Sequence, residues 1–374
     1  ITNEFKKAGL ENPEGLENYR QSYSQRVRKV NKVPKLELVD EKGNMIKEYK
    51  YIEDFTIVTT WPNIRTKGDI IAPVYPIDEL RNYEIEEVQG RFGIMSEEMK
   101  NKFPDYDSFA SGTINASLGA GAYGIIVERK LNTEQYPYTK YPVSPVVMDF
   151  TTVNDNGPMV YYVSTPVYNE MKEETSKGAL VHASIDCSID DVQTSNVIGY
   201  IPGSDEELKN EYIIISAHLD HVGSNGDETY NPGGLDNGSG IASILEIAKT
   251  IQEQKIKPKK SIVFIAFNGE EEGKIGSQNY IKEPVFPLDK SVVINLDMVG
   301  SKKIIPLTIE SYDEEKTDLR DEFITFSEEI GIESIADFGN RSDHGPFGEV
   351  GVPAINLIHY DWNGYHTPYD TIDK

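Results

Sequence analysis

The segment Asn231–Gly240, with the sequence NPGGLDNGSG, constrains the fold more than any other stretch of this chain. An apolar run ending in a histidine, residues 212–218, comes before it, and an amphipathic helical pattern over residues 241–251 follows it. Asp236 therefore lies where a glycine-rich loop turns into the start of a helix. That position suits a carboxylate, and the glycines let another group approach closely.

The later half of the chain alternates apolar runs with helical patterns. Buried strands are expected at residues 212–217, 261–267, 291–296 and 352–358. The helix after Asp236 and a second helix near 318–330 alternate with them. This order predicts an α/β fold with a mostly parallel sheet that is flanked by helices on both faces.

The earlier half has a different pattern of apolar and polar residues. A chain of 374 residues is long enough for two domains. Short β-like runs alternate there with Pro, Gly and Asp breaks. These runs are residues 35–39, 55–60, 69–74, 143–150, 160–163, 180–185 and 197–201. The pattern predicts a β-rich block that is a separate module from the α/β half.

Charge and cysteine content exclude several classes of function. Lys+Arg minus Asp+Glu is 37 − 62 = −25, which argues against nucleic acid or an anionic membrane as the main partner. No apolar run is long enough to cross a bilayer. Cys187 is the single cysteine, so an intrachain disulfide and a multi-cysteine metal site are both impossible. Its alternating surroundings predict a buried thiol.

The glycines at 119, 121 and 124 spell the dinucleotide fingerprint GxGxxG. Nucleotide binding by this motif needs a strand before the glycines and a helix after them, so that pyrophosphate meets the helix N-terminus. Here a helix-compatible run comes first and a strand, Gly124–Glu128, follows. Close packing of a helix against a strand explains the glycines better than a nucleotide site does.

Candidate metal ligands lie just beyond the predicted strands. His218 and Asp220 end the first run, Glu270 and Glu271 follow the second, and Asp297 ends the third. In open α/β sheets, ligands collect at the carboxyl ends of the strands. These side chains can therefore converge although they are far apart in the sequence.

The residue types agree with zinc. Zinc takes neutral imidazole nitrogen and carboxylate oxygen, and two zinc ions roughly 3.5–4 Å apart need a bridging carboxylate. The predicted ligands, two imidazoles and three carboxylates, are His218, Asp236, Glu271, Asp297 and His366. Asp220 is placed to orient an imidazole or to accept its second N–H.

Glu270 is the natural general base, because it stands beside a predicted ligand and can take a proton from water and return it to a leaving amine. Physical reasoning alone leaves open how these roles are divided within Glu270–Glu272. Taken singly, the candidates also have structural explanations: a helix cap at Asp236, an exposed acidic loop at Glu270–Glu272, a core histidine at His218. Five ligand-type residues at strand ends make coincidence a poor explanation.

The remaining histidines are weaker candidates. His221, His344 and His359 are less secure than the five predicted ligands, and His182, in the β-rich block, is expected to be structural. Asp370 is expected to cap a terminal helix.

The chain resembles the co-catalytic di-zinc aminopeptidase family, which includes aminopeptidase Y and is related to glutamate carboxypeptidase and the transferrin receptor. The matching segments occur in the family's order and span nearly all of residues 195–374. They are SAHLDHVG (216–223), PGGLDNGSG (232–240), FNGEEEGKIGSQNYI (267–281), INLDMVG (294–300), RSDHGPF (341–347) and YHTPYDT (365–371).

The resemblance implies a zinc-peptidase fold and assigns roles within the site. It makes Glu270 the base, Glu271 a ligand and Asp236 the bridging carboxylate, and it implies that Tyr365 helps to stabilise the tetrahedral intermediate. It also implies that a loop lines the substrate pocket and includes Arg341, Asp343 and His344.

The β-rich block resembles a protease-associated domain, which in larger relatives is inserted after the first helix of the peptidase domain. The implied organisation is a discontinuous peptidase domain, residues 1–40 and 193–374, with residues 41–192 inserted.

The expected function is a metallo-aminopeptidase with two Zn²⁺ ions that hydrolyses the first peptide bond of peptides with a free N-terminus. A carboxypeptidase or dipeptidase on the same site would need several arginines to hold a second carboxylate, and only Arg320 and Arg341 lie in the later half. A catalytically inactive, receptor-like relative is a third alternative, which the intact ligands and base disfavour. Because the family is often secreted or periplasmic, an extracellular or periplasmic location is expected.

Overall fold

The computed structural model describes residues 1–51, 53–57, 64–129, 156–223, 230–361 and 364–373. They form two compact units. The first unit is Ile1–Gln25, Asp191–Gly223 and Asn231–Lys374, and the second is Arg26–Asp190 and Ser224–Tyr230. The first segment of the first unit ends at Gln25, and the later part of β1 (Arg20–Val39) pairs with β2 (Met45–Glu48) in the second unit. The domain boundaries predicted from the sequence stay a prediction.

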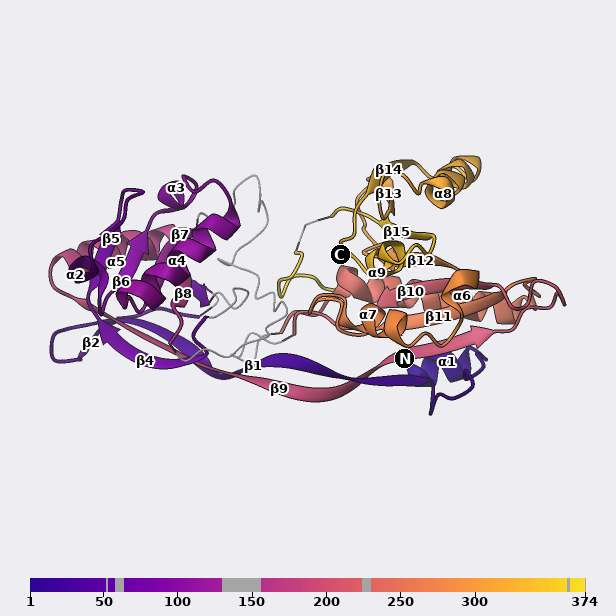
Figure 1. The fold of residues 1–374 in the computed structure, drawn as a ribbon, viewed down its shortest axis with the longest axis horizontal. Helices are drawn as coiled ribbons and strands as arrows, with labels where there is room; N and C mark the ends of the chain where they lie inside the picture. The colour runs from indigo at the N-terminus through magenta and orange to yellow at the C-terminus, as the bar shows by residue number, and fades with distance from the viewer. Residues whose placement is uncertain (52, 58–63, 130–155, 224–229, 362–363, 374) are drawn as a thin grey trace. The chain divides into compact units, whose positions relative to one another are not determined.

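The sheet of the first unit has the strand order β14-β13-β15-β12-β10-β11-β9, and it continues from β9 to β1 (Figure 1). Its strands are β9 (Leu180–Ile201), β10 (Tyr212–His218), β11 (Ser261–Phe267), β12 (Ser291–Asp297), β13 (Leu307–Ser311), β14 (Ser334–Phe338) and β15 (Ala354–Ile358). The four central strands, β15, β12, β10 and β11, are parallel, so their carboxyl ends lie at one edge. β9 and β13 pair antiparallel with β11 and β15, which makes the sheet mixed.

All four strands expected from apolar runs are confirmed, and β13 and β14 are additions. The side chains of β11 alternate between two cores, as the two-residue period of a strand requires. Phe264 and Ala266 pack with α1 (Thr2–Lys7) and α6 (Gly240–Glu253) on one face. Val263, Ile265 and Phe267 pack with α7 (Ile275–Lys282) and α9 (His344–Glu349) on the other. The predicted helix near 318–330 is α8 (Asp318–Glu329).

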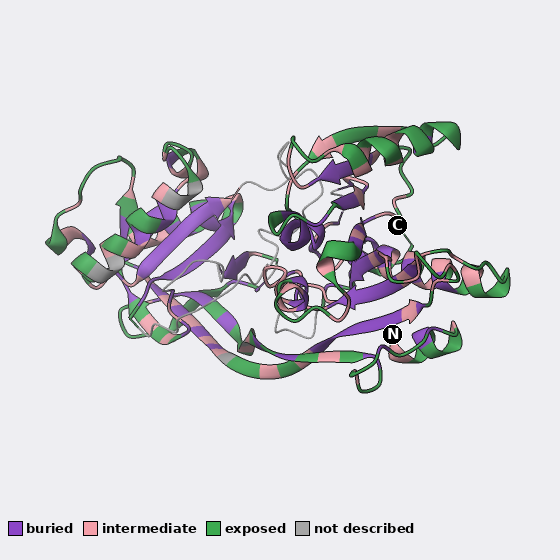
Figure 2. Cartoon of the chain, turned by 45° about the vertical axis from the view of Figure 1, so that its right-hand side comes forward, coloured by how far each residue is buried: buried purple, intermediate pink, exposed green. Residues whose placement is uncertain are grey.

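The second unit contains a five-stranded sheet with the order β3-β8-β7-β6-β5. Its strands are β3 (Phe55–Ile57), β5 (Val74–Ile77), β6 (Phe92–Met95), β7 (Gly124–Arg129) and β8 (Met159–Ser164), and every residue of β6 and β8 is buried (Figure 2). β4 (Lys67–Ala72) pairs antiparallel with β9. The predicted strand at 143–150 lies outside the described residues.

The second unit contains helices as well as strands. β5, β6, β7 and β8 are parallel neighbours, and parallel strands need long crossover connections that are usually helical. The helices of this unit are α2 (Ile85–Val88), α3 (Glu97–Lys100), α4 (Tyr106–Ala120) and α5 (Thr165–Ser176). The assignment of the unit as a protease-associated domain stays a prediction.

The GxGxxG glycines follow the expected order of helix and then strand, but the close approach that the structure shows is between two strands and not between a helix and a strand. α4 precedes the last two glycines and β7 begins at Gly124, so the order is helix and then strand. A Cβ atom at Gly124 would lie 1.9 Å from the backbone oxygen of Met159, in the neighbouring strand β8. The Cys187 thiol is buried, as predicted. Among the described residues, no helix combines the length and apolar character needed to traverse a bilayer.

Candidate metal centre

Strand ends bring ligand-type side chains to the carboxyl edge of the sheet in the first unit. His218 is the last residue of β10 and Asp297 the last of β12. Glu271 follows β11 closely, and Asp236 lies in the irregular turn that leads into α6. Because these strands are parallel neighbours, residues far apart in the chain meet at this edge.

Asp236 lies at the centre of the cluster. Its Oδ1 is 3.2 Å from Nε2 of His218, and its Oδ2 is 3.0 Å from Nε2 of His366. Nε2 of His218 is also 3.4 Å from Oδ1 of Asp297, and Nε2 of His366 is 3.1 Å from Oε2 of Glu271. One carboxylate thus faces two separate pairs of imidazole and carboxylate, and all five residues named as ligands from the sequence are brought together.

These side chains form two overlapping groups of possible ligand atoms. One group is His218, Asp236 and Asp297, and the other is His221, Asp236, Glu271 and His366; the ligand atoms of each group lie within 4.8 Å of one another. Oδ1 of Asp297 and Nε2 of His366 are buried without a hydrogen-bond partner in the described structure. Buried polar atoms rarely stay unpaired, and this donor set is the one that zinc takes, so the residues fit a divalent cation.

Burial and neighbouring charges shift the ionisation of the cluster in directions that favour a cation. Burial by itself lowers the pKa of His366, but the carboxylates of Glu271 and Asp236 outweigh it and raise the pKa to about 9. Burial also lowers the pKa of His218, but Asp297 and Asp236 outweigh it and raise the pKa well above the ordinary value. The carboxylates therefore draw positive charge to this point, whether from protons or from a metal.

Asp220 holds the turn after β11. Its Oδ1 and Oδ2 accept the backbone N–H groups of Glu270 and Glu271, each at 3.2 Å. Nδ1 of His218 lies 3.1 Å from the backbone oxygen of Asp220 and 4.0 Å from its carboxylate. The sequence suggested that the carboxylate accepts the second imidazole N–H; the backbone carbonyl is the nearer acceptor, because the carboxylate is engaged by the two amides.

Glu270 lies beside the cluster, and burial raises its pKa well above the ordinary value, with nearby carboxylates adding to the rise. Tyr365 stacks on the ring of His366, with the ring centroids 3.6 Å apart. His366 itself has a φ of 54°, in the left-handed region that residues other than glycine seldom adopt. Such conformations persist where the surrounding structure imposes them, as at functional sites.

The loop 341–344 lies outside both groups of ligand atoms. Nη2 of Arg341 binds Oε1 of Glu310 at 2.7 Å and Oδ2 of Asp337 at 3.3 Å. Asp343 accepts a hydrogen bond of 2.5 Å from the Ser277 hydroxyl. Asp343 and His344 are fully buried, so their side chains support the loop from inside and do not line its outer surface.

Two residues near Asp236 were missed or misplaced by sequence reasoning. Asp370 does not cap a terminal helix: its carboxylate accepts the backbone N–H groups of Leu235, at 2.7 Å, and Asp236, at 3.0 Å. Nδ1 of His221 lies 2.8 Å from Oε1 of Glu271. The sequence offered one signal for His221, its place three residues after His218, and no signal for Asp370.

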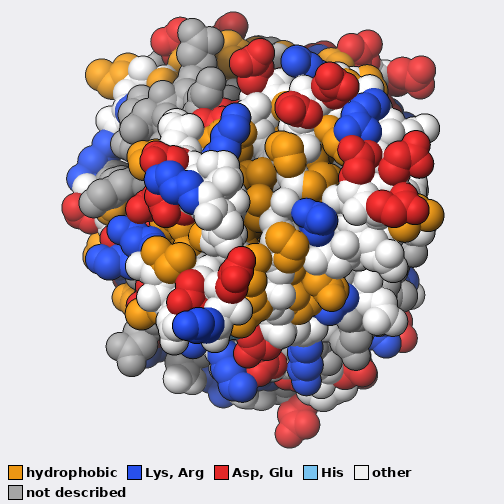
Figure 3. Space-filling model, turned by 90° about the vertical axis from the view of Figure 1, so that its left-hand side faces the viewer, with side chains coloured by type: hydrophobic (Ala, Val, Ile, Leu, Met, Phe, Trp, Pro, Cys, Tyr) orange, Lys and Arg blue, Asp and Glu red, His pale blue; other side chains and the backbone are white. Residues whose placement is uncertain are grey.

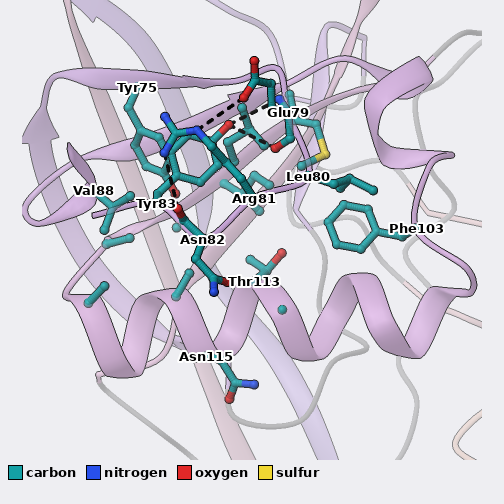
Figure 4. Close-up of a pocket in the computed structure, with 18 residues that line it drawn as sticks. Tyr75, Glu79, Leu80, Arg81, Asn82, Tyr83, Val88, Phe103, Thr113 and Asn115 are labelled. Carbon is teal, nitrogen blue, oxygen red and sulfur yellow. Dashed lines mark hydrogen bonds and ion pairs between the residues drawn. The ribbon is translucent and has the colours of Figure 1, made fainter. Parts of the chain in front are cut away.

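The second unit contains a cavity of about 790 Å³ that no predicted site residue lines. Tyr75, Leu80, Tyr83 and Phe103 contribute apolar walls. The guanidinium of Arg81 lies 3.9 Å from the ring centre of Tyr83 (Figure 4). Arg81 also pairs with Glu87 at 2.8 Å, so its charge is neutralised within the protein. On the face of the molecule that Figure 3 shows, hydrophobic side chains are exposed between acidic and basic side chains.

The family comparison agrees with the location of the cluster. Residues 196–374 match the model of peptidase family M28. Aminopeptidase YwaD of Bacillus subtilis is 35% identical over 48% of this chain and 40% of that protein. A glutamate carboxypeptidase 2 homolog of Caenorhabditis elegans is 31% identical over 47% of this chain and 26% of that protein. The chain therefore spans less than half the length of these curated relatives.

Solved structures give the same fold. A zinc aminopeptidase from Bacillus subtilis aligns with 100% of this chain and 81% of its own, with a TM-score of 0.68 and 23% identity. An aminopeptidase from Aneurinibacillus sp. strain AM-1 aligns with the same shares, with a TM-score of 0.65 and 21% identity. The mixed α/β fold is thus the fold of these aminopeptidase structures, and the residues that match the model of peptidase family M28 contain the whole cluster.

Proposed function

We propose that this chain is a zinc-dependent aminopeptidase that hydrolyses the N-terminal peptide bond of peptides. The two zinc ions would be held by two groups that share Asp236: His218 and Asp297 on one side, Glu271 and His366 on the other. The observation that carries the proposal is the division of the Asp236 carboxylate, whose Oδ1 and Oδ2 face different histidines at 3.2 and 3.0 Å. Zinc ions bound there would polarise the scissile carbonyl and make water nucleophilic at neutral pH.

Glu270 is the proposed general base. Because burial raises its pKa, its carboxylate holds a proton more readily near neutral pH than an exposed glutamate does. It would accept a proton from the attacking water and pass it to the departing amine. Asp220 supports this role by binding the backbone N–H of Glu270, which holds the turn in place.

Tyr365 is the proposed donor to the developing oxyanion, because its ring is held against His366 at the edge of the cluster. The free amine of the substrate would be attracted by the carboxylates of Glu270 and Asp297. A substrate-binding role stays a prediction for Arg341, while Asp343 and His344 would act indirectly through the loop.

The pairing of the arginines favours an aminopeptidase over a carboxypeptidase or dipeptidase. Recognition of a substrate carboxylate needs a guanidinium with free charge and donors. Arg320 donates to Oδ1 of Asp321 at 2.8 Å, and Arg341 binds Glu310. Both arginines of the later half are thus paired with carboxylates of the protein.

A paired assay with zinc quantified tests the proposal. Aminoacyl anilides or peptides with a free amine should be cleaved, whereas the matching N-acetylated substrates should not. Glu270→Gln should keep the fold and the bound zinc but lose turnover by about two to four orders of magnitude. Normal hydrolysis by that variant would refute the role of Glu270. Absence of zinc together with inactivity on free and blocked peptides would favour a receptor-like relative.

A further inference from the structure

His221 makes a side-chain contact in the cluster that the expected ligand set does not explain. Its Nδ1 lies 2.8 Å from Oε1 of Glu271, while the other oxygen of that carboxylate, Oε2, faces Nε2 of His366 at 3.1 Å. The two oxygens of Glu271 are therefore divided between two histidines. The His221 side chain is 9% exposed, so the contact is shielded from water.

The neighbouring loop leaves room for this ring. A Cβ atom at Gly233 would lie 2.8 Å from Cγ of His221, and Gly233 has a φ of 66°, which disfavours any larger residue there. On another side, the ring meets His366 edge to face, with the centroids 5.3 Å apart. The imidazole of His221 is thus held between the glycine-rich loop and a ligand histidine.

We propose that His221 is a positioning residue for Glu271. Its Nδ1–H donates to Oε1, which leaves Oε2 as the oxygen that faces the second group of ligand atoms. This inference rests on the proposed function, in which that group holds zinc. Hydrogen bonds to a ligating carboxylate fix its orientation, and their loss typically lowers metal affinity about 10–100-fold.

The rival interpretation makes His221 a fourth ligand of the second group, whose atoms all lie within 4.8 Å. The distances favour the hydrogen bond. The separation of 2.8 Å is that of an ordinary N–H···O bond, and Nδ1 of His221 is 3.9 Å from Oδ2 of Asp236. Donor atoms on one tetrahedral zinc, with bonds of ~2.0–2.1 Å, lie roughly 3.3 Å apart. The pairs made by His218 and His366, at 3.0–3.4 Å, match that spacing better.

The test compares wild-type protein with His221→Asn and His221→Leu. Asparagine places an amide N–H near the position of Nδ1, whereas leucine fills space without a donor. Zinc affinity is measured by competition with a chromogenic chelator, and the number of imidazoles per zinc by X-ray absorption. We expect His221→Leu to lose about 10–100-fold in zinc affinity and His221→Asn to recover most of it. The imidazole count should be the same in all three proteins.

His182→Leu, in the second unit, is the matched control and should bind zinc like wild type. Unchanged affinity in His221→Leu would overturn the positioning role. A lower imidazole count in both His221 variants, without rescue by asparagine, would also overturn it, in favour of direct ligation. Wild-type protein that takes up no zinc would instead refute the proposed function, so the two failures are distinguishable. Circular dichroism of the zinc-free proteins checks that each variant is folded.

Discussion

Each unit contains a cluster of histidine and carboxylate side chains. In the first unit, three histidines and two further carboxylates surround Asp236. In the second, His182 lies between two carboxylates: Nδ1 is 2.7 Å from Oε2 of Glu37, and Nε2 is 2.5 Å from Oδ1 of Asp69. The residue types are the same, but the arrangements are not.

The difference lies in whether the polar atoms converge. Both ring nitrogens of His182 already have a carboxylate partner, and the two carboxylates are on different sides of the ring. In the first unit, Nε2 of His366 faces carboxylate oxygens of Asp236 and Glu271 together, at 3.0 and 3.1 Å. The comparison indicates that several ligand atoms converging on one point, and not composition, distinguish a candidate metal site from an ion pair.

Removing the shared carboxylate should have the largest effect. Asp236→Asn is expected to lower zinc affinity by about 100-fold or more, beyond the ~10–100-fold typical of outer-shell changes, because both groups lose a charged ligand. Asp69→Asn, the same change in the second unit, should leave zinc binding unchanged. Equilibrium dialysis with metal analysis measures both. Loss of zinc in Asp69→Asn would break the comparison.

Bound zinc should stabilise the strands around the first cluster and not those of the second unit. Hydrogen exchange of the backbone amides measures both. Zinc at 100 times its Kd stabilises the folded state by about 2.7 kcal/mol. Amides of β10, β12 and the turn before α6 should therefore exchange up to about 100-fold faster after a chelator removes the zinc. Amides of β6, β7 and β8 should not change. Equal acceleration in both units would contradict local binding.

Zinc binding should release protons from the first cluster. His366, with a pKa raised to about 9, is mainly protonated near neutral pH, and a ligand imidazole must be neutral. Calorimetric titration in buffers of different ionisation enthalpy should therefore report at least about one proton released per chain near neutral pH. His182→Gln should release the same number. No release would mean that the histidines are already neutral.

The smallest expected effect is a pH dependence of the second unit. Burial lowers the pKa of His182, but Asp69 and Glu37 outweigh it and raise the pKa above 6.5. A raised pKa stabilises the fold below the unfolded value, and this contribution is lost as pH rises through the folded value. The substitution His182→Gln should remove this loss of stability with rising pH. The loss is under about 1 kcal/mol because Asp69 is largely exposed. Thermal unfolding between mildly acidic and mildly alkaline pH measures it. A wild-type profile in His182→Gln would contradict the ion pair.

Much of the first unit could be predicted because its signals are local. The four central strands are largely buried, so each appears as a mainly apolar run, and the helix α6 carries its apolar residues at helical spacing. The second unit was harder, because its helix α5 interrupts a series of β-like runs and has few buried residues. The candidate ligands were recognisable because each stands at the end of a strand or loop.

The sequence by itself determined the α/β order of residues 195–374, the separate earlier block and the side chains that can bind a metal, since periodicity and residue type are properties of neighbouring residues. Only the tertiary structure decided that Asp220 binds backbone amides, that Asp370 holds the turn at Asp236 and that His221 meets Glu271. These contacts join residues 50 or 134 positions apart. Local patterns carry no information about them, because they depend on which strand ends become neighbours in the sheet.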